Sequence, residues 1–303
     1  MDLRRAEPVV PFAVWRKDAM ILQVTLTVPE GKRIIARAAA SLPETRNALK
    51  EGKILLKGGT TVSALAEELI GSSLGICGRV SPLGTKGPRA AALGAPHCML
   101  IEKGRMKDVD DTLEREVLRL ERDDVFVIGA NAIDVHGNAA MMAGSPLGGP
   151  PGRVLGGLSA EGINVLILAG LEKLIPTNIS DAVRACGRKR IDLAFGMAVG
   201  LVPLIGRLIT EQTALEILAD VKCTVIGRGG ICGAEGATTM VVEGEKSAVR
   251  EIFRHVEEVK GASTSGALES LTECTRGGIG CREDLGCVYK TPVKPSFWGD
   301  AND

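Results

Sequence analysis

The chain has 303 residues, enough to bury a sizeable hydrophobic core in one large domain or two modest ones. Lys plus Arg and Asp plus Glu both total 37, so the net charge argues against nucleic acid and against an anionic membrane as partners. Hydrophobic residues make up 45% of the chain and aromatic residues only 3%, so we expect a globular core of Val, Leu, Ile and Ala.

Prolines and charges interrupt the N-terminal stretch MDLRRAEPVVPFAVWRKDAMILQV, which has no uninterrupted apolar segment typical of a signal peptide or membrane span. We therefore expect a cytoplasmic protein. Four cysteines stand singly in apolar surroundings and are expected to be reduced thiols in that compartment: Cys77, Cys98, Cys186 and Cys223.

Residues 1–50 are expected to form an N-terminal segment followed by two helices. In TVPEGKRIIARAAASLPETRNALKEG the apolar residues have helical spacing, and Pro43 marks the break between the helices. The next stretch, KILLKGGTTVSALAEELIG, is typical of a short strand, a glycine turn and a helix that ends at Gly71. It begins the main α/β domain, which we assign to residues 51–205.

Apolar strands and helical stretches alternate through the rest of this domain. The expected strands are SLGICGRV, HCMLIE, DVFVIG, NVLILAG and IDLAFGMAV, and the expected helices include VDDTLEREVLRLER and NISDAVRACGR. This alternation predicts a doubly wound open α/β sheet, mostly parallel, with helices on both faces. A ligand is then expected at the carboxyl ends of the strands.

Residues 206–262 are expected to form a strand, a glycine loop, a second strand and a helix. This small C-terminal α+β unit is either a separate lobe or an extension of the main sheet, and hydrophobic periodicity does not distinguish the two. Residues 263–303 form a tail rich in Cys, Gly and Pro, which we expect to cover the surface.

The first candidate site is the glycine turn in LKGGTTVSALAEEL. Gly58, Gly59, Thr60 and Thr61 leave a strand and enter a helix, so their N–H groups and hydroxyls can bind a phosphate or carboxylate. The stretch has neither the Lys-Ser/Thr ending of a P-loop nor the G-x-G-x-x-G dinucleotide pattern. The alternative is an ordinary tight turn with a threonine cap.

The second candidate site is VFVIGANAIDVHGNAA, residues 125–140, where a buried strand runs into a polar cluster. Asp134 is expected to transfer a proton or bind ligand hydroxyls, and His136 to act as a second acid or base. Asn131 and Asn138 are expected to hold a substrate oxygen. The alternative is a loop that uses Asn, Asp and Gly for its own turns, with a solvated histidine.

The third candidate site is GRGGICGAEGATTMV, residues 227–241, where many glycines indicate a loop whose backbone closely approaches another group. Glu235 is a candidate base or nucleophile, and Arg228 a candidate clamp for an anion. The alternative is a flexible glycine hairpin with a surface ion pair of little energetic value.

The cysteines of the tail are weak candidates for a metal site. Cys274, Cys281 and Cys287, with or without Cys232, are numerous enough to hold zinc or an iron–sulfur cluster. Their spacings of six and five intervening residues do not fit a C-x-x-C pattern. Ordinary thiols or a disulfide within the tail are therefore preferred to a metal.

Three of these stretches resemble known families. KGGTTVSALAEEL resembles the phosphate turn near the start of ribose-5-phosphate isomerases, and VIGANAIDVHGNAA is similar to the G-A-D-x-x-x-x-G stretch of methylthioribose-phosphate isomerases and the related initiation-factor exchange subunits. LILAGLEKLIP is similar to a segment of the lactate-utilisation domain. The resemblance covers about residues 50–240 and points to the superfamily of glucosamine-phosphate deaminase, ribose-phosphate isomerase and the CoA transferases.

The chain departs from these families at named positions. The aspartate of the G-A-D stretch falls on Asn131, so Asp134 would have to take its acid role from another position on the turn. The Lys-Gly-Gly-Gly-Gly stretch of ribose-phosphate isomerases has no convincing counterpart. GRGGICGAEG is only faintly similar to the glutamate-glycine nucleophile region of CoA transferases.

The resemblance implies an enzyme that acts on a small anionic, phosphorylated polyhydroxy substrate by proton transfer or isomerisation, with no metal or other cofactor required. A second reading is a ligand-sensing or assembly protein on the same fold, which binds without turnover. A third is a CoA or acyl transferase with Glu235 as nucleophile, for which CoA would be the cofactor. Relatives of this kind commonly pair, so a homo-oligomer is expected.

Overall fold

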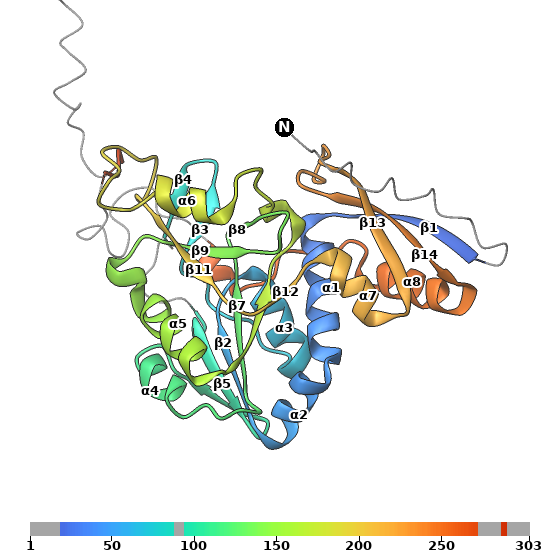
Figure 1. The fold of residues 1–303 in the computed structure, drawn as a ribbon, viewed down its shortest axis with the longest axis horizontal. Helices are drawn as coiled ribbons and strands as arrows, with labels where there is room; N and C mark the ends of the chain where they lie inside the picture. Colours follow the sequence, from blue (N-terminus) through green and yellow to red (C-terminus); the bar gives the residue numbers. More distant parts are fainter. Residues whose placement is uncertain (1–18, 88–93, 272–285, 290–303) are drawn as a thin grey trace, which may run out of the picture.

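The computed structural model describes residues 19–87, 94–271 and 286–289. Its centre is a six-stranded sheet with the order β12-β10-β7-β2-β5-β6 (Figure 1). Strands β12, β10, β7 and β2 are parallel, and β5 and β6 are antiparallel to their neighbours. The bounds are Lys53–Lys57 for β2, Cys98–Glu102 for β5, Arg105–Asp108 for β6, Val125–Gly129 for β7, Asn164–Leu168 for β10 and Arg207–Ile209 for β12. The predicted mostly parallel sheet is confirmed.

Helices cover both faces of this sheet, which is why β2, β7 and β10 are apolar almost throughout. On one face, Leu56 and Val127 share a core with α1 (Val28–Ser41), α3 (Thr60–Ile70) and α7 (Glu211–Leu218). On the other face, Leu55 and Phe126 pack with α4 (Leu113–Val117) and α5 (Gly149–Glu161). The doubly wound arrangement is therefore confirmed.

The predicted helix boundaries near the N-terminus have a clear physical basis. The break between α1 and α2 (Pro43–Glu51) falls at Leu42, whose extended backbone is what a following proline favours. Helix α3 starts after Gly59 and ends at Gly71, which has the left-handed φ of 67° that a C-terminal glycine permits.

A second, three-stranded antiparallel sheet lies beside the main one, at the right of Figure 1. It contains β1 (Ala19–Leu26), β14 (Thr238–Glu245) and β13 (Val221–Arg228), with α8 (Lys246–Val259) packed against β1 and β14. The strand-loop-strand-helix unit is thus a lobe with its own sheet, completed by a strand from the N-terminal segment. Helix α1 contacts α3, α7 and α8, so it joins the lobe to the main sheet.

Smaller elements lie at the carboxyl ends of the parallel strands. Strands β8 (Ala132–Ile133), β9 (Ala139–Ala143) and β11 (Gly200–Leu204) form one small sheet, and β3 (Arg79–Ser81) pairs with β4 (Gly84–Lys86). The remaining helical segments are η1 (Pro146–Gly148), η2 (Leu171–Lys173), α6 (Ile179–Ala185) and α9 (Leu268–Leu271). Within the three described ranges, no helix combines the length and apolar character needed to cross a bilayer.

Two predicted strands are absent from the main sheet. In SLGICGRV only the last residues join a strand, because Gly75 instead donates its N–H to Pro96 O beside the start of β5. IDLAFGMAV forms only isolated bridges, and Phe195 is exposed. Both segments are apolar enough to resemble strands, but they do not join the ladder of the six-stranded sheet. The helix predicted in VDDTLEREVLRLER is also shorter, spanning only Leu113–Val117.

Candidate active site

The carboxyl ends of β10 and β12 bring together two acidic side chains that lie far apart in the sequence. These strands are adjacent and parallel, so the chain leaves both at the same edge of the sheet. Glu172 lies in η2, which follows β10, and Glu211 is the first residue of α7, which follows β12. This edge is where ligands bind in open α/β sheets.

Glu211 is the more buried of the two, with 2% of its surface exposed. Its Oε2 accepts a hydrogen bond of 2.7 Å from the N–H of Leu171, which ties α7 to the loop after β10. Burial raises the pKa of Glu211 to about 7, and the negative charge of Glu172 adds to this effect. The Leu171 N–H and the positive charge of Arg228 oppose the rise in pKa without cancelling it. The carboxyl group therefore exchanges protons near neutral pH.

Glu172 lies in a different environment. Both of its carboxylate oxygens are buried, yet they accept no hydrogen bond from the part of the chain that the structure describes. Lys32 Nζ lies 3.7 Å from Glu172 Oε1, and Lys173 Nζ lies 3.9 Å from the same oxygen. Lys32 is itself buried, which lowers its pKa, while the charge of Glu172 opposes that lowering. Buried positive and negative groups therefore meet at one point.

Two glycines make room for the carboxylates. A Cβ at Gly170 would overlap Glu172 Oε2 and stand 2.9 Å from Glu211 Oε1, so both carboxylates face the same piece of backbone. A Cβ at Gly31, in α1, would stand 2.6 Å from Glu211 Oε1. Any side chain at either position would displace a carboxylate.

The glycine loop between β13 and β14 lies against this cluster. A Cβ at Gly236 would stand 3.5 Å from Glu172 Cβ and 3.0 Å from Val28 Cγ2, so the expected close approach of the loop backbone is found there. Arg228 is exposed at the end of β13 and acts electrostatically on Glu211. Glu235 is exposed, and its Oε2 accepts a hydrogen bond of 3.0 Å from Gly233 N within the same loop. Of the third predicted site, Arg228 thus acts electrostatically on Glu211.

The Gly-Gly-Thr-Thr turn lies at the carboxyl end of β2. Gly58 has a packing role, because a Cβ there would stand 2.4 Å from His97 O and 2.8 Å from Gly75 O. At Gly59 the space is open, with no described atom within 4 Å of where a Cβ would stand. Thr60 is half-buried and Thr61 is buried. The turn is formed as expected, and its role in anion binding stays a prediction.

The polar cluster of residues 131–138 contains β8 and the turn that joins β8 to β9. Asp134 is buried, and its carboxylate accepts hydrogen bonds from the backbone N–H groups of His136, Asn138 and Ile179 and from the side-chain amide of Asn138. Burial opposes ionisation of Asp134, but these bonds outweigh it and lower the pKa to about 2. The carboxylate holds the turn and the start of α6 together.

The other members of this cluster are also engaged locally or exposed. Asn131 Oδ1 accepts a hydrogen bond of 2.9 Å from Met142 N, which fixes the start of the turn against β9. The side chains of His136 and Asn138 are exposed. These contacts match the alternative interpretation of the loop, and the predicted roles of its side chains towards a ligand stay predictions.

The cysteine hypothesis falls partly outside the described residues. Cys274 and Cys281 lie outside them, Cys287 is half-buried and Cys232 is exposed. No cluster of three or more potential ligands from His, Cys, Asp and Glu occurs within residues 19–87, 94–271 and 286–289.

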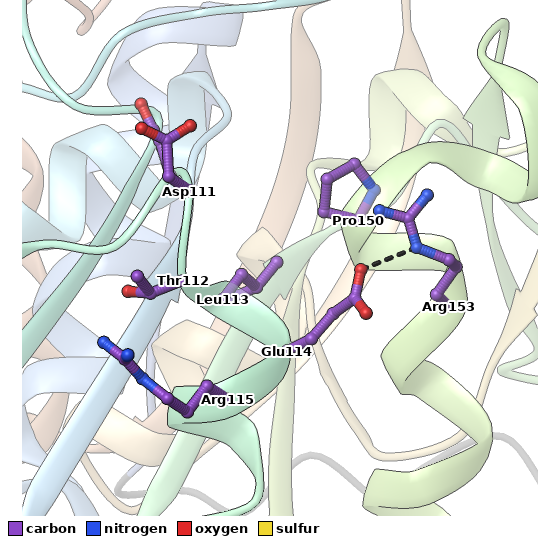
Figure 2. A pocket seen from close by; sticks show the side chains of 8 residues that line it. Asp111, Thr112, Leu113, Glu114, Arg115, Pro150 and Arg153 are labelled. Atoms are coloured by element: carbon purple, nitrogen blue, oxygen red, sulfur yellow. Dashed lines mark hydrogen bonds and ion pairs between the residues drawn. The ribbon is translucent and has the colours of Figure 1, made fainter.

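A surface hollow of about 460 Å³ lies between α4 and the start of α5 (Figure 2). Its lining residues are Asp110, Asp111, Thr112, Leu113, Glu114, Arg115, Pro150 and Arg153. Arg153 Nε donates to Glu114 Oε1 at 2.6 Å, as the dashed line in Figure 2 shows. This ion pair ties α5 to α4, so Arg153 and Glu114 have a structural role. The carboxylate cluster is chemically the stronger candidate.

Compared with protein-family models, curated proteins and solved structures, the chain shows no significant match to any of them. Membership of the isomerase and transferase superfamily therefore stays a proposal.

Proposed function

We propose that the protein is an enzyme that moves protons on a small anionic, phosphorylated polyhydroxy substrate, with Glu211 and Glu172 as its proton-handling groups. The observation that carries this proposal is the buried pair of carboxylates beside Lys32 at the carboxyl ends of β10 and β12. Fully buried Glu and Lys side chains are rare unless they are paired or functional.

The two carboxylates are suited to different parts of one reaction. Because two negative charges repel each other in a buried site, one carboxyl group retains its proton to higher pH. Lys32 stabilises a negative charge on Glu172, whereas Glu211 has the raised pKa. Glu172 is then the base that takes a proton from the carbon next to a carbonyl group, and Glu211 is the acid that protonates the carbonyl oxygen.

The positive groups around the pair favour an anionic substrate. Lys32 and Lys173 lie close to the Glu172 carboxylate. Arg228 is exposed at the end of β13, directly before the glycine loop, where it can bind a phosphate or carboxylate. Thr60 and Thr61, with the open space at Gly59, are kept as a second point of anion binding. No metal or other cofactor is needed for this reaction.

Asp134 and Glu235, which the sequence suggests as catalytic residues, are not the proton-transfer groups of the proposed reaction. Asp134, with a pKa of about 2, is a weak base at neutral pH, so we assign it to positioning the turn after β8. Glu235 lies in the loop over Glu172 and is kept as the nucleophile of the alternative CoA or acyl transfer. We also keep pairing of two copies as a proposal.

The test is exchange of carbon-bound hydrogen with solvent. The full-length protein is incubated in D₂O with a panel of aldose and ketose phosphates, and proton NMR follows the hydrogen next to the carbonyl group. We expect that signal to disappear for one substrate, and the Glu211→Gln variant to exchange at least about 100-fold more slowly. Glu216→Gln, which changes an exposed glutamate of the same helix, is the matched control.

Two outcomes would redirect the assignment. Exchange that persists in Glu211→Gln and Glu172→Gln would remove both groups from the reaction. Absence of exchange across the panel, together with a covalent adduct at Glu235 after incubation with CoA esters, would support the transferase instead.

A further inference from the structure

Lys57 is a second basic group at the carboxyl edge of the sheet, and it takes no part in the carboxylate cluster. It is the last residue of β2, a strand in the middle of the sheet, and its side chain is half-buried. Because side chains alternate along a strand, Lys53, Leu55 and Lys57 point to one face, which is the face that packs against α4 and α5.

Lys57 has no counter-ion in the described part of the chain. No hydrogen bond or ion pair joins its ammonium group to residues 19–87, 94–271 or 286–289. Lys57 pairs with Cys98 across strands β2 and β5. Cys77 affects the pKa of Lys57, and the charge of Lys57 affects the pKa of His97. An unpaired ammonium group in such surroundings is costly to keep charged.

The groups around Lys57 are neutral at physiological pH. Burial raises the pKa of Cys77 to about 11 and that of Cys98 to about 12, so both remain thiols. Burial and the charge of Lys57 lower the pKa of His97 to about 3, and its Nδ1 donates to Gly75 O at 2.7 Å. None of these three side chains compensates a positive charge.

The acidic group of this cluster is already committed to the backbone. Asp110 accepts a hydrogen bond of 3.0 Å from His97 N and one of 2.5 Å from Cys98 N, and these hold the start of β5 in place. Burial lowers the pKa of Lys57, and the neighbouring Cys98 and Cys77 side chains oppose that lowering. A larger share of its side chain is the free amine, whose lone pair is available to attack an electrophile.

Lys53 provides a contrast within the same strand. It lies four residues earlier on the same face, and its Nζ forms an ion pair of 3.0 Å with Asp124 Oδ2. The two lysines share strand and orientation, and they differ in that only Lys53 is paired with a carboxylate.

We propose that Lys57 is a nucleophilic lysine that condenses with the carbonyl group of an aldehyde or ketone substrate. The amine nitrogen forms a bond to the carbonyl carbon, and the carbonyl π electrons move to oxygen. The nitrogen gives up its two protons and the oxygen takes up two, so that water leaves as the nitrogen lone pair forms the C=N bond. The product is an imine between Lys57 and the substrate. This step does not depend on Glu211, so it stands if the proton-transfer assignment fails.

The test is reductive trapping. The full-length protein is treated briefly near neutral pH with glyceraldehyde 3-phosphate and sodium cyanoborohydride, which reduces the imine to a stable secondary amine. Cleavage after glutamate releases residues 52–67 as one peptide that contains both Lys53 and Lys57, and fragment ions then assign the modified residue. We expect Lys57 to react several-fold faster than Lys53, because burial lowers the pKa of Lys57 while the Lys53 ammonium group is held in an ion pair with Asp124.

Two further measurements test whether Lys57 is the reactive lysine. Lys57→Met removes the amine without introducing a fixed charge, so this peptide should keep only the slower adduct at Lys53 while the melting temperature stays close to that of the wild type. In the wild type, the labelling rate of Lys57 should level off at a lower pH than is ordinary for a lysine, because burial lowers its pKa. Equal labelling of the two lysines, or an unmodified Lys57 in a protein labelled at other lysines, would overturn the assignment.

Discussion

At the scale of single residues, the environment of a side chain decides its chemistry more than its type does. Asp134 and Glu211 are both buried carboxyl groups, but four N–H donor contacts lower the pKa of the first while burial beside Glu172 raises that of the second. Sequence reasoning selected Asp134 from its dense polar surroundings and passed over Glu211. An acidic residue in the first turn of a helix is common for electrostatic reasons alone, so Glu211 carried no distinctive signal.

Glu211 should make stability depend on pH in a specific direction. Its folded pKa of about 7 lies above its ordinary value of 4.5, so its stabilising contribution is complete below pH 4.5 and is lost as the pH rises through 7. Relative to Glu211→Gln, the wild type should lose on the order of 3 kcal/mol in free energy of unfolding between these limits. Urea denaturation of both proteins at pH 4.5 and pH 8 measures this difference. The same change in free energy of unfolding with pH in both proteins would contradict the prediction.

Asp134 should behave as a structural residue. Asp134→Ala removes the acceptor of the backbone N–H groups of His136, Asn138 and Ile179, and should lower the free energy of unfolding by about 2 kcal/mol or more. Urea denaturation at neutral pH measures the loss. An unchanged free energy of unfolding, together with loss of exchange of the substrate's carbon-bound hydrogen, would instead support Asp134 as the catalytic base.

At the scale of elements, periodicity predicted the elements that have one strong local signal. Strands β2, β7 and β10 and helices α1, α3 and α8 follow from their apolar patterns. The pairing of β1 with β14 could not be predicted, because alternation along a strand does not specify a partner more than 200 residues away. The cluster of Lys32, Glu172 and Glu211 was missed for the same reason, since its members come from three separate connections.

Gly170 should be essential for the geometry of this cluster. Its φ of −68° suits any residue, so replacement by alanine introduces no backbone strain and tests only the space. The added methyl group would overlap Glu172 Oε2. We therefore expect Gly170→Ala to slow the exchange of the substrate's carbon-bound hydrogen with solvent at least about tenfold. Gly157→Ala in α5, where a Cβ meets no described atom within 4 Å, is the control and should leave the rate unchanged.

At the scale of the whole molecule, the lobe and the main sheet share one hydrophobic core. Val24, Val242 and Ile252 of the lobe belong to the same buried cluster as Leu56 and Val127 of the main sheet. The fold class was predictable because alternating strands and helices leave few ways to bury both faces of a sheet. The position of the lobe beside the main sheet was not predictable, because it depends on contacts of α1 with both parts.

The shared core predicts one cooperative unfolding transition. Ile252→Ala removes a side chain that is fully buried in α8 and should lower the free energy of unfolding by about 2–5 kcal/mol. The amide protons of β14 and β7 should then lose their protection from exchange with solvent to the same degree. Phe253→Ala, at a neighbouring position with 50% exposure, should have little effect. Loss of protection in β14 alone would show that the lobe unfolds separately.

The protonation state of Glu211 is the most direct test of the account, because the proposed chemistry depends on a carboxyl group that keeps its proton near neutral pH. The measurement is a pH titration of side-chain carboxyl ¹³C signals in glutamate-labelled protein, with Glu211→Gln to assign the resonance. One signal should titrate near pH 7 in the wild type and be missing from the variant. If every glutamate carboxyl group instead titrates near the ordinary value of about 4.3, Glu211 is not held protonated, and the proposed division of roles between the two carboxylates is wrong.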